Sequence, residues 1–214
     1  MPDRVHFSEP EIGFLKDLFD RGAHRAARSL SLLTDQDVAL SVPVVRLATA
    51  AAFAEQMAGL TSICGVTQRL HGALETSAML LFAEEKSLEI VRYMLERLMP
   101  YEVLSELHQD AITEVGNIML NACVGSIAKR LDVVIGVDPP EFCLGPKESF
   151  FAFEAEGAGT TYLDVRIDLR MIATSVETVW IFALHEETFH TLKTLMAGRL
   201  GSAPVGAELE LAGG

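Results

Sequence analysis

The chain repeats its own order of predicted elements, and this internal repetition restricts its possible folds more than any other feature. Its 214 residues divide into two halves of about 100, each with a helix, an extended segment, a hairpin and a second helix. At the front of each half, Asp20 corresponds to Asn117, an offset of 97 residues. At the back the offset is about 102, where Phe82-Ala-Glu-Glu resembles Leu184-His-Glu-Glu. We therefore expect a duplicated unit with unequal halves.

The predicted elements follow from hydrophobic periodicity and from the residues that begin or end helices and strands. Helices are expected at residues 8–33, 48–60, 84–99, 101–131 and 186–200, and strands at residues 38–47, 61–70, 76–82, 160–173 and 177–184, with a short extended segment at Pro139 and Pro140. Strands 61–70 and 76–82 should pair as one hairpin, and the last two strands as another. Strand 38–47 contains Pro43, which favours the edge of a sheet.

This order predicts an α+β fold with a pseudo-twofold axis. Two antiparallel hairpin sheets should join edge to edge, with the long helices packed on them. Residues 1–200 should form a single domain of two repeats, at about 8–100 and 101–200. The Gly- and Ala-rich residues 201–214 are expected to form a flexible tail.

Composition narrows the classes of function. With 17 basic and 30 acidic residues the formal net charge is −13, which repels phosphate backbones, so we expect no nucleic-acid partner. Three cysteines without a CxxC pair favour free thiols in a reducing compartment. The N-terminal residues lack the apolar run of a secretory signal, and the Ala-rich stretch Leu47–Gly59 is too short and too polar to cross a bilayer. We expect a cytoplasmic protein that does not engage a membrane.

The predicted helix at residues 101–131 has an apolar side and a polar side. The apolar side, expected to pack on the sheet, comprises Ile112, Val115, Ile118, Met119, Ala122 and Ser126. The polar side carries Asp110, Glu114, Asn117 and Asn121, followed by the small residues Gly125 and Ala128. Glu114 and Asn117 are three residues apart, which puts their Cβ atoms roughly 5–6 Å apart and suits a catalytic pair. Gly116 and Gly125 each cost roughly 1 kcal/mol relative to Ala, which favours a working surface over a merely solvated one.

The corresponding helix of the first half differs in its chemistry at these positions. Asp17 stands where the second half has Glu114, and is one methylene shorter. Asp20 stands in place of Asn117 and cannot donate a hydrogen bond when ionised. If the second copy is catalytic, Asp17 and Asp20 therefore mark a degenerate second site.

No metal site is expected in this chain. His185 and His190 are five residues apart, whereas two histidines on a zinc-binding helix are four apart. Asp17 and Asp20 alone supply too few oxygen ligands for a tight cation site.

At these residues the chain resembles the CheC family of chemotaxis phosphatases, which includes the single-site relative CheX. The family pattern is Asp or Ser, three residues, Glu, two residues, Asn, 22 residues and Pro. Asp110, Glu114, Asn117 and Pro140 match this pattern in full. The likeness covers both long helices, both hairpins and the duplicated order. The first half departs from the pattern at Asp17 and Asp20, which implies one working site.

The resemblance implies an activity and a partner. Proteins of this family dephosphorylate the response regulator CheY, which carries its phosphoryl group on an aspartate. By this likeness, Asn117 would orient the attacking water and Glu114 would pair with the active-site lysine of the regulator. Asp110, Asn121 and Pro140 would contact the partner. The chain itself would bind no cofactor, since the Mg²⁺ would be held by the regulator.

The same resemblance leaves a second class of function open. Some relatives act by holding partners, such as the receptor deamidase CheD, or as components of the flagellar switch. The intact Glu114 and Asn117 pair favours the enzyme over such an adaptor. A regulator of a two-component system unrelated to motility is a third possibility.

Overall fold

The computed structural model describes most of the chain. The described residues are 6–49, 51–52, 55, 59–60, 62–94, 101–146, 150, 161–171 and 174–200. The elements are α1 (Glu9–Thr34), β1 (Val38–Ala48), β2 (Ile63–Gly72), β3 (Thr76–Ala83), α3 (Glu84–Met94), α4 (Tyr101–Leu131), β4 (Ile135–Val137), β5 (Glu141–Gly145), β6 (Thr161–Met171), β7 (Thr174–Leu184) and α6 (Glu186–Leu200). The tail expected at residues 201–214, most of the helix expected at 48–60 and the end of the helix expected at 84–99 lie outside the described residues.

The strands form a seven-stranded antiparallel sheet, which confirms the predicted α+β class. Its order is β1-β6-β7-β3-β2-β4, and β5 pairs with β2 next to β4. Both predicted hairpins are present, as β2 with β3 and β6 with β7, and β3 joins β7 at the centre. There Met79 pairs with Ile181, its own equivalent at an offset of 102 residues, so the pseudo-twofold axis passes through this pair.

The two halves exchange their first strands, which the sequence did not predict. Strand β1 of the first half pairs with β6 of the second half. Strands β4 and β5 of the second half lie end to end along β2 of the first half. The expected position of strand 38–47 at an edge is confirmed, and Pro43 lies where the pairing of β1 shifts register.

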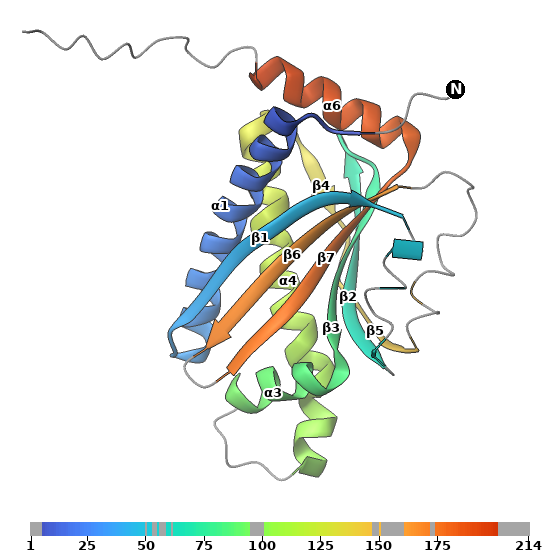
Figure 1. The fold of residues 1–214 in the computed structure, drawn as a ribbon. Helices are drawn as coiled ribbons and strands as arrows, with labels where there is room; N and C mark the ends of the chain where they lie inside the picture. Colours follow the sequence, from blue (N-terminus) through green and yellow to red (C-terminus); the bar gives the residue numbers. More distant parts are fainter. Residues whose placement is uncertain are drawn as a thin grey trace, which may run out of the picture.

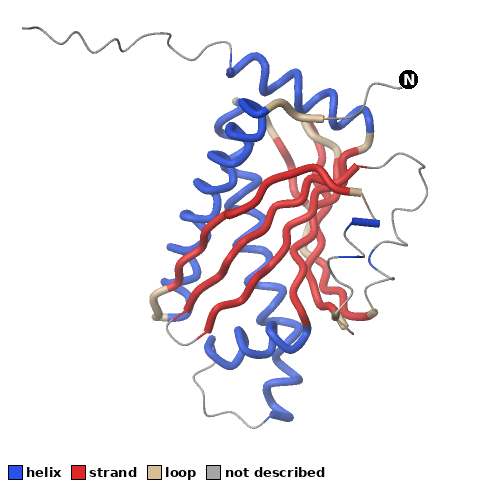
Figure 2. Tube along the Cα trace, viewed as in Figure 1, coloured by secondary structure: helices blue, strands red, loops and turns tan. Residues whose placement is uncertain are grey.

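Helices α1 and α4 lie side by side on one face of the sheet and run in opposite directions (Figure 1, Figure 2). They approach closely, because a Cβ atom added to Gly22 on α1 would collide with Cys123 on α4. Where the start of α1 meets the end of α4, the guanidinium of Arg130 lies 5.0 Å from the ring centre of Phe14. Cys123 is fully buried at the crossing and serves as a small packing residue.

Side chains alternate between the two faces of the sheet. Ala78, Leu80 and Phe82 of β3 face α1 and α4 in the main apolar core. Met79 and Leu81 belong to a second, smaller apolar cluster on the other face. The long helices thus cover one face, and α4 rests on β2 and β3 close to the edge that β4 and β5 complete.

Among the described residues, a long apolar helical stretch lies in α4. Leu107–Leu131 is long and apolar enough to cross a membrane by length and composition, and half of it is buried in the fold. Its contacts with α1 and with the sheet account for this composition, since a helix covered on two sides is apolar around most of its circumference.

Candidate functional site

The position of α4 on the sheet depends on a glycine. A Cβ atom added to Gly116 would lie 2.5 Å from the side chain of Val66 on β2, so the helix backbone rests directly on that strand. Gly116 is therefore a packing residue, and the expectation that it marks an exposed working surface was wrong. The equivalent residue of α1, at an offset of 97, is Phe19, which is fully buried. Asn117 follows Gly116 and is brought close to β2 by the same contact.

The polar side of α4 is accessible, and its apolar side is buried as predicted. Asp110, Glu114 and Asn121 are exposed, and Asn117 is partly buried. Of the residues expected to face the sheet, Ile112, Val115, Met119, Ala122 and Ser126 are buried, whereas Ile118 is only partly so. Gly125 does not lie on an open surface, because it faces Arg25 of α1.

The carboxamide of Asn117 is held through its oxygen. Asn121, one turn further along α4, donates from Nδ2 to Oδ1 of Asn117 at 2.6 Å. Gln68 on β2 donates from Nε2 to the same oxygen at 3.4 Å. Within the described part of the chain the NH₂ group of Asn117 has no partner, so this group remains to meet solvent or another molecule.

Gln68 is the residue of the site that sequence reasoning missed. Its side chain is only 3% exposed, and its Nε2 also donates to the backbone oxygen of Asp138 at 3.2 Å. Its Oε1 is buried and has no hydrogen-bond partner. A signal was present in the sequence, because Gln68 alternates with the apolar residues Val66 and Leu70 on the side of β2 that faces the helices.

Pro140 lies in the connection between β4 and β5. This connection is attached to β2 at Asp138, whose N–H donates to the carbonyl of Arg69 at 2.9 Å. The side chain of Asp138 also approaches β2, since one of its carboxylate oxygens lies 3.6 Å from Nδ1 of His71. Pro140 itself is partly buried. Gln68 thus joins the two parts of the predicted site, the helix with Asn117 and the segment with Pro140.

The carboxylates of Glu114 and Asp110 extend the site along α4. Among the described residues, neither forms an ion pair with a basic side chain. Glu114 is thus an exposed and uncompensated negative charge one helical turn from Asn117.

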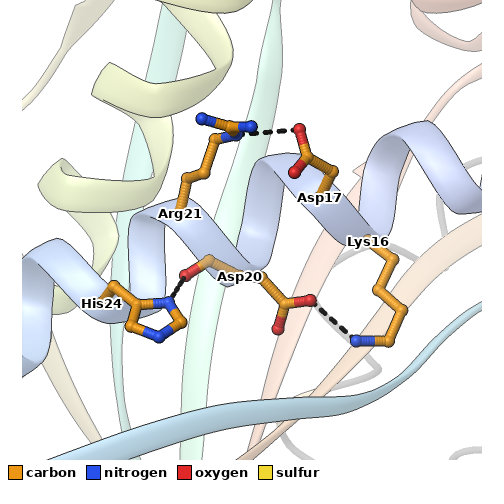
Figure 3. A network of polar contacts seen from close by, with 5 residues as sticks. All are labelled: Lys16, Asp17, Asp20, Arg21 and His24. Carbon is orange, nitrogen blue, oxygen red and sulfur yellow. Dashed lines mark hydrogen bonds and ion pairs between the residues drawn. The ribbon is translucent and has the colours of Figure 1, made fainter. Parts of the chain in front are cut away.

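The first-half positions are arranged differently (Figure 3). Asp17 forms an ion pair with Arg21 at 2.8 Å, and Asp20 forms one with Lys16 at 2.7 Å. The carbonyl of Asp20 is also bonded to Nδ1 of His24 at 2.7 Å. Each carboxylate is therefore neutralised by its own helix, as expected for a solvated surface with i, i+4 pairs.

The cysteines are not activated as nucleophiles. Burial raises the pKa of the Cys64 thiol to about 12 and that of the Cys143 thiol to about 11. Because the thiolate is the reactive form, both thiols are unreactive near neutral pH. In the described ranges there is no group of three or more His, Cys, Asp or Glu side chains that could hold a metal ion.

No family model matches the sequence. The fold is nevertheless shared with solved structures. FliY from Thermotoga maritima superposes with a TM-score of 0.76 at 15% identity, covering 90% of this chain and 98% of FliY. FliM from H. pylori, solved in complex with SpeE, has a TM-score of 0.67 at 9% identity, covering 90% of this chain and 97% of that one.

A third similar structure is CheX. CheX of Borrelia burgdorferi, in a complex with CheY, BeF₃ and Mg²⁺, has a TM-score of 0.51 at 17% identity. The match covers 79% of this chain and 97% of that one. At these identities the likeness concerns the fold, and the chain has the α+β fold shared by FliY, the FliM middle domain and the chemotaxis protein CheX.

Proposed function

We propose that this chain is a phosphatase that hydrolyses the aspartyl phosphate of a CheY-type response regulator, in chemotaxis or another two-component system, with one working site in its second repeat. The observation that carries this proposal is the pair on α4. Glu114 is exposed and without an ion pair among the described residues, and Asn117 is fixed through its oxygen with its NH₂ group left over. Residues 17 and 20 of α1 have neither property.

The chemistry suits such a pair. Phosphoryl transfer depends mainly on positioning and on stabilisation of charge, and asks little covalent work of the protein. Asn117 orients the attacking water in line with the phosphorus, and a carboxamide can do so without being a strong base. Glu114 pairs with the active-site lysine of the regulator and so seats α4 against the phosphorylated aspartate. The Mg²⁺ belongs to the regulator.

The remaining predicted residues surround this pair. Asp110 lies one turn before Glu114, and Asn121 lies one turn after Asn117. Pro140 lies in the β4–β5 connection, which Gln68 links to Asn117 through the backbone oxygen of Asp138. We place these three residues at the contact with the regulator. The similarity to a CheX that was solved bound to CheY supports this type of partner, and we place the protein in the cytoplasm with it.

A second candidate function is a non-catalytic adaptor. FliY and FliM superpose with higher TM-scores than CheX, and FliM was solved in complexes with FliG and with SpeE. A component of the flagellar switch, or a binding partner of a CheD-like deamidase, could keep the fold without using Asn117. The uncompensated Glu114 beside Asn117 favours the enzyme.

The experiment uses CheY-type receiver domains labelled with ³²P from acetyl phosphate. Loss of label is followed with the wild-type chain, with Asn117→Ala and with the matched control Asp20→Ala. We expect acceleration that Asn117→Ala abolishes and Asp20→Ala leaves unchanged. Equal losses in both variants would refute the single working site, and binding of the receiver domain without acceleration would favour the adaptor.

A further inference from the structure

We propose that Gln68 is a positioning residue for Asn117. Its NH₂ group holds the oxygen of Asn117 toward the sheet, and so turns the NH₂ group of Asn117 outward. This inference rests on the proposed phosphatase function for its consequence in catalysis, but its geometric part can be tested separately.

The surroundings of Gln68 make a purely structural role unfavourable. It lies on the side of β2 that faces α4, between Val66 and Leu70, where an apolar side chain would pack without leaving a polar atom unpaired. Its Oε1 is buried and unpartnered, which destabilises the fold. Departures of this kind from local rules are expected at functional sites.

The orientation of the Gln68 carboxamide is determined by its partners. The backbone oxygen of Asp138, 3.2 Å from Nε2, can only accept a hydrogen bond, so Gln68 must present its NH₂ group on this side. The same Nε2 is 3.4 Å from Asn117, which must then present its oxygen. The donor from Asn121 reinforces this orientation. The chain of bonds from Asp138 therefore sets which end of Asn117 faces outward.

The first half lacks this device. Gln68 pairs with Ala78 in the first hairpin, and the equivalent of Ala78 at an offset of 102 is Trp180. Trp180 pairs with Val165 in the second hairpin, so Val165 is the pseudo-twofold equivalent of Gln68. Val165 is fully buried and cannot donate to Asp20. At this pair of equivalent positions, the second-half helix therefore faces a polar residue, Gln68, and the first-half helix faces an apolar one, Val165.

Gln68 also connects the helix to the β4–β5 connection. One nitrogen atom contacts both Asn117 and the backbone two residues before Pro140. The distance between the helix and this connection is therefore set by a side chain from a third element, the strand β2. A regulator seated against both would meet a site of fixed width.

The test compares Gln68→Met with the matched control Gln36→Met. Gln36 is partly buried and, like Gln68, donates from Nε2 to a backbone oxygen, that of Tyr93 at 2.8 Å, but it lies away from the site. Rates of ³²P loss from a CheY-type receiver domain are measured over a range of receiver concentrations. We expect Gln68→Met to lower the maximal rate roughly tenfold with little change in the half-saturating concentration, because a misplaced group slows a reaction more than it weakens binding.

A double variant separates positioning from a general effect on the fold. In the Asn117→Asp background, which should keep a measurable residual rate, Gln68→Met should cause no further loss, because there is no NH₂ group left to turn outward. A loss by the same factor in both backgrounds would overturn the proposal, as would full activity of Gln68→Met. If Gln68→Met does not fold, Gln68→Val replaces it, since valine is the residue at the equivalent position 165.

An NMR measurement decides the geometric part even if the wild-type chain proves inactive toward regulators. The side-chain NH₂ signals of Asn117 are identified by their loss in Asn117→Ala. Their heteronuclear NOE should fall in Gln68→Met and stay unchanged in Gln36→Met. An unchanged NOE in Gln68→Met would overturn the proposal whatever the enzymatic result, whereas an inactive wild type would overturn only the phosphatase function.

Discussion

Helices α1 and α4 are equivalent in the pseudo-twofold arrangement, but their outer faces are polar in different ways. On α1, Asp17 and Asp20 are each paired with a basic residue one turn away (Figure 3). On α4, Glu114 has no such pair in the described residues, and Asn117 is bonded to a strand and to its own helix. The comparison teaches that duplication of a fold does not by itself duplicate a functional site. The repeated helix fixes the spacing of the residues, but the neighbouring side chains determine which polar groups stay available to a partner.

The two helices also differ in how closely they approach the sheet and in which strand side chain they meet there. Gly116 lets α4 lie directly on Val66, whereas α1 has the buried Phe19 at the equivalent position. The ring of Phe19 packs against that of Phe182, with 5.4 Å between the ring centres. On α4 the missing side chain brings Asn117 within reach of Gln68, and on α1 the strand offers only Val165 at the corresponding place.

The largest expected effect on the dephosphorylation rate comes from replacing Asn117 of α4 with aspartate, the residue at the equivalent position 20 of α1. Asn117→Asp keeps an oxygen that can accept from Gln68 and Asn121, but it replaces the NH₂ group with a second oxygen that cannot donate. We expect the dephosphorylation rate of a CheY-type receiver domain to fall roughly 100-fold, the loss typical of one well-placed donor. Circular dichroism and thermal unfolding check that the fold is retained.

The reciprocal change should not create a site. In an Asn117→Ala background, Asp17→Glu combined with Asp20→Asn should restore no phosphatase activity, because Lys16 remains beside position 20 and the position equivalent to Gln68 remains the apolar Val165. Recovery of activity in this variant would show that the two residue types suffice, and would remove the distinction between the two helices drawn above.

A second expected effect concerns the packing of α4. Gly116→Ala should lower the free energy of unfolding by about 1–3 kcal/mol, because the added Cβ would overlap Val66. Gly125→Ala is the matched control, since a Cβ there would lie 3.6 Å from Arg25, an ordinary contact. It should be neutral or stabilising by up to about 1 kcal/mol. Urea unfolding measures both, and equal effects would contradict the packing role of Gly116.

Most of the fold could be predicted because its signals are local. The hairpins follow from β-branched runs separated by short turns, and β2 with β3 and β6 with β7 pair as expected. The exchange of β1 with β4 and β5 between the halves could not be predicted. It depends on which strand edge each segment meets after the hairpins have joined, and local periodicity carries no information about that choice.

Only the part of the candidate site that lies on a single helix, α4, could be predicted from the sequence. The spacing of Glu114 and Asn117 follows from the helical repeat, and so does the exposure of that face. The partner Gln68 comes from a strand 49 residues earlier, and its contact with Asn117 depends on register and on the depth of the helix. Gly116 illustrates the same limit, because the cost of a helical glycine indicates a constraint but not the side from which it comes.

A third, smaller effect is the pH dependence of stability that comes from a buried histidine in the first part of α4. His108 on α4 is 7% exposed, and burial lowers its pKa, opposed only in part by the charge of Glu84. Because the unfolded chain binds this proton more readily, stability should fall as the pH is lowered below about 6.5. His108→Gln removes the titration and should reduce this part of the pH dependence. Denaturant unfolding at several pH values checks it, and an unchanged slope would contradict a buried neutral His108.

The smallest expected effect is on the ion pairs of α1. Lys16→Ala removes the pair with Asp20, in which the two side chains are 45% and 35% exposed. Exposed pairs of this kind contribute little, so the free energy of unfolding should change by less than about 0.5 kcal/mol, and the change should shrink further in high salt. Phosphatase activity should be unaffected. A larger loss of stability, or any loss of activity, would mean that the face of α1 does more than interact with solvent, and the contrast with α4 would have to be redrawn around two functional helices.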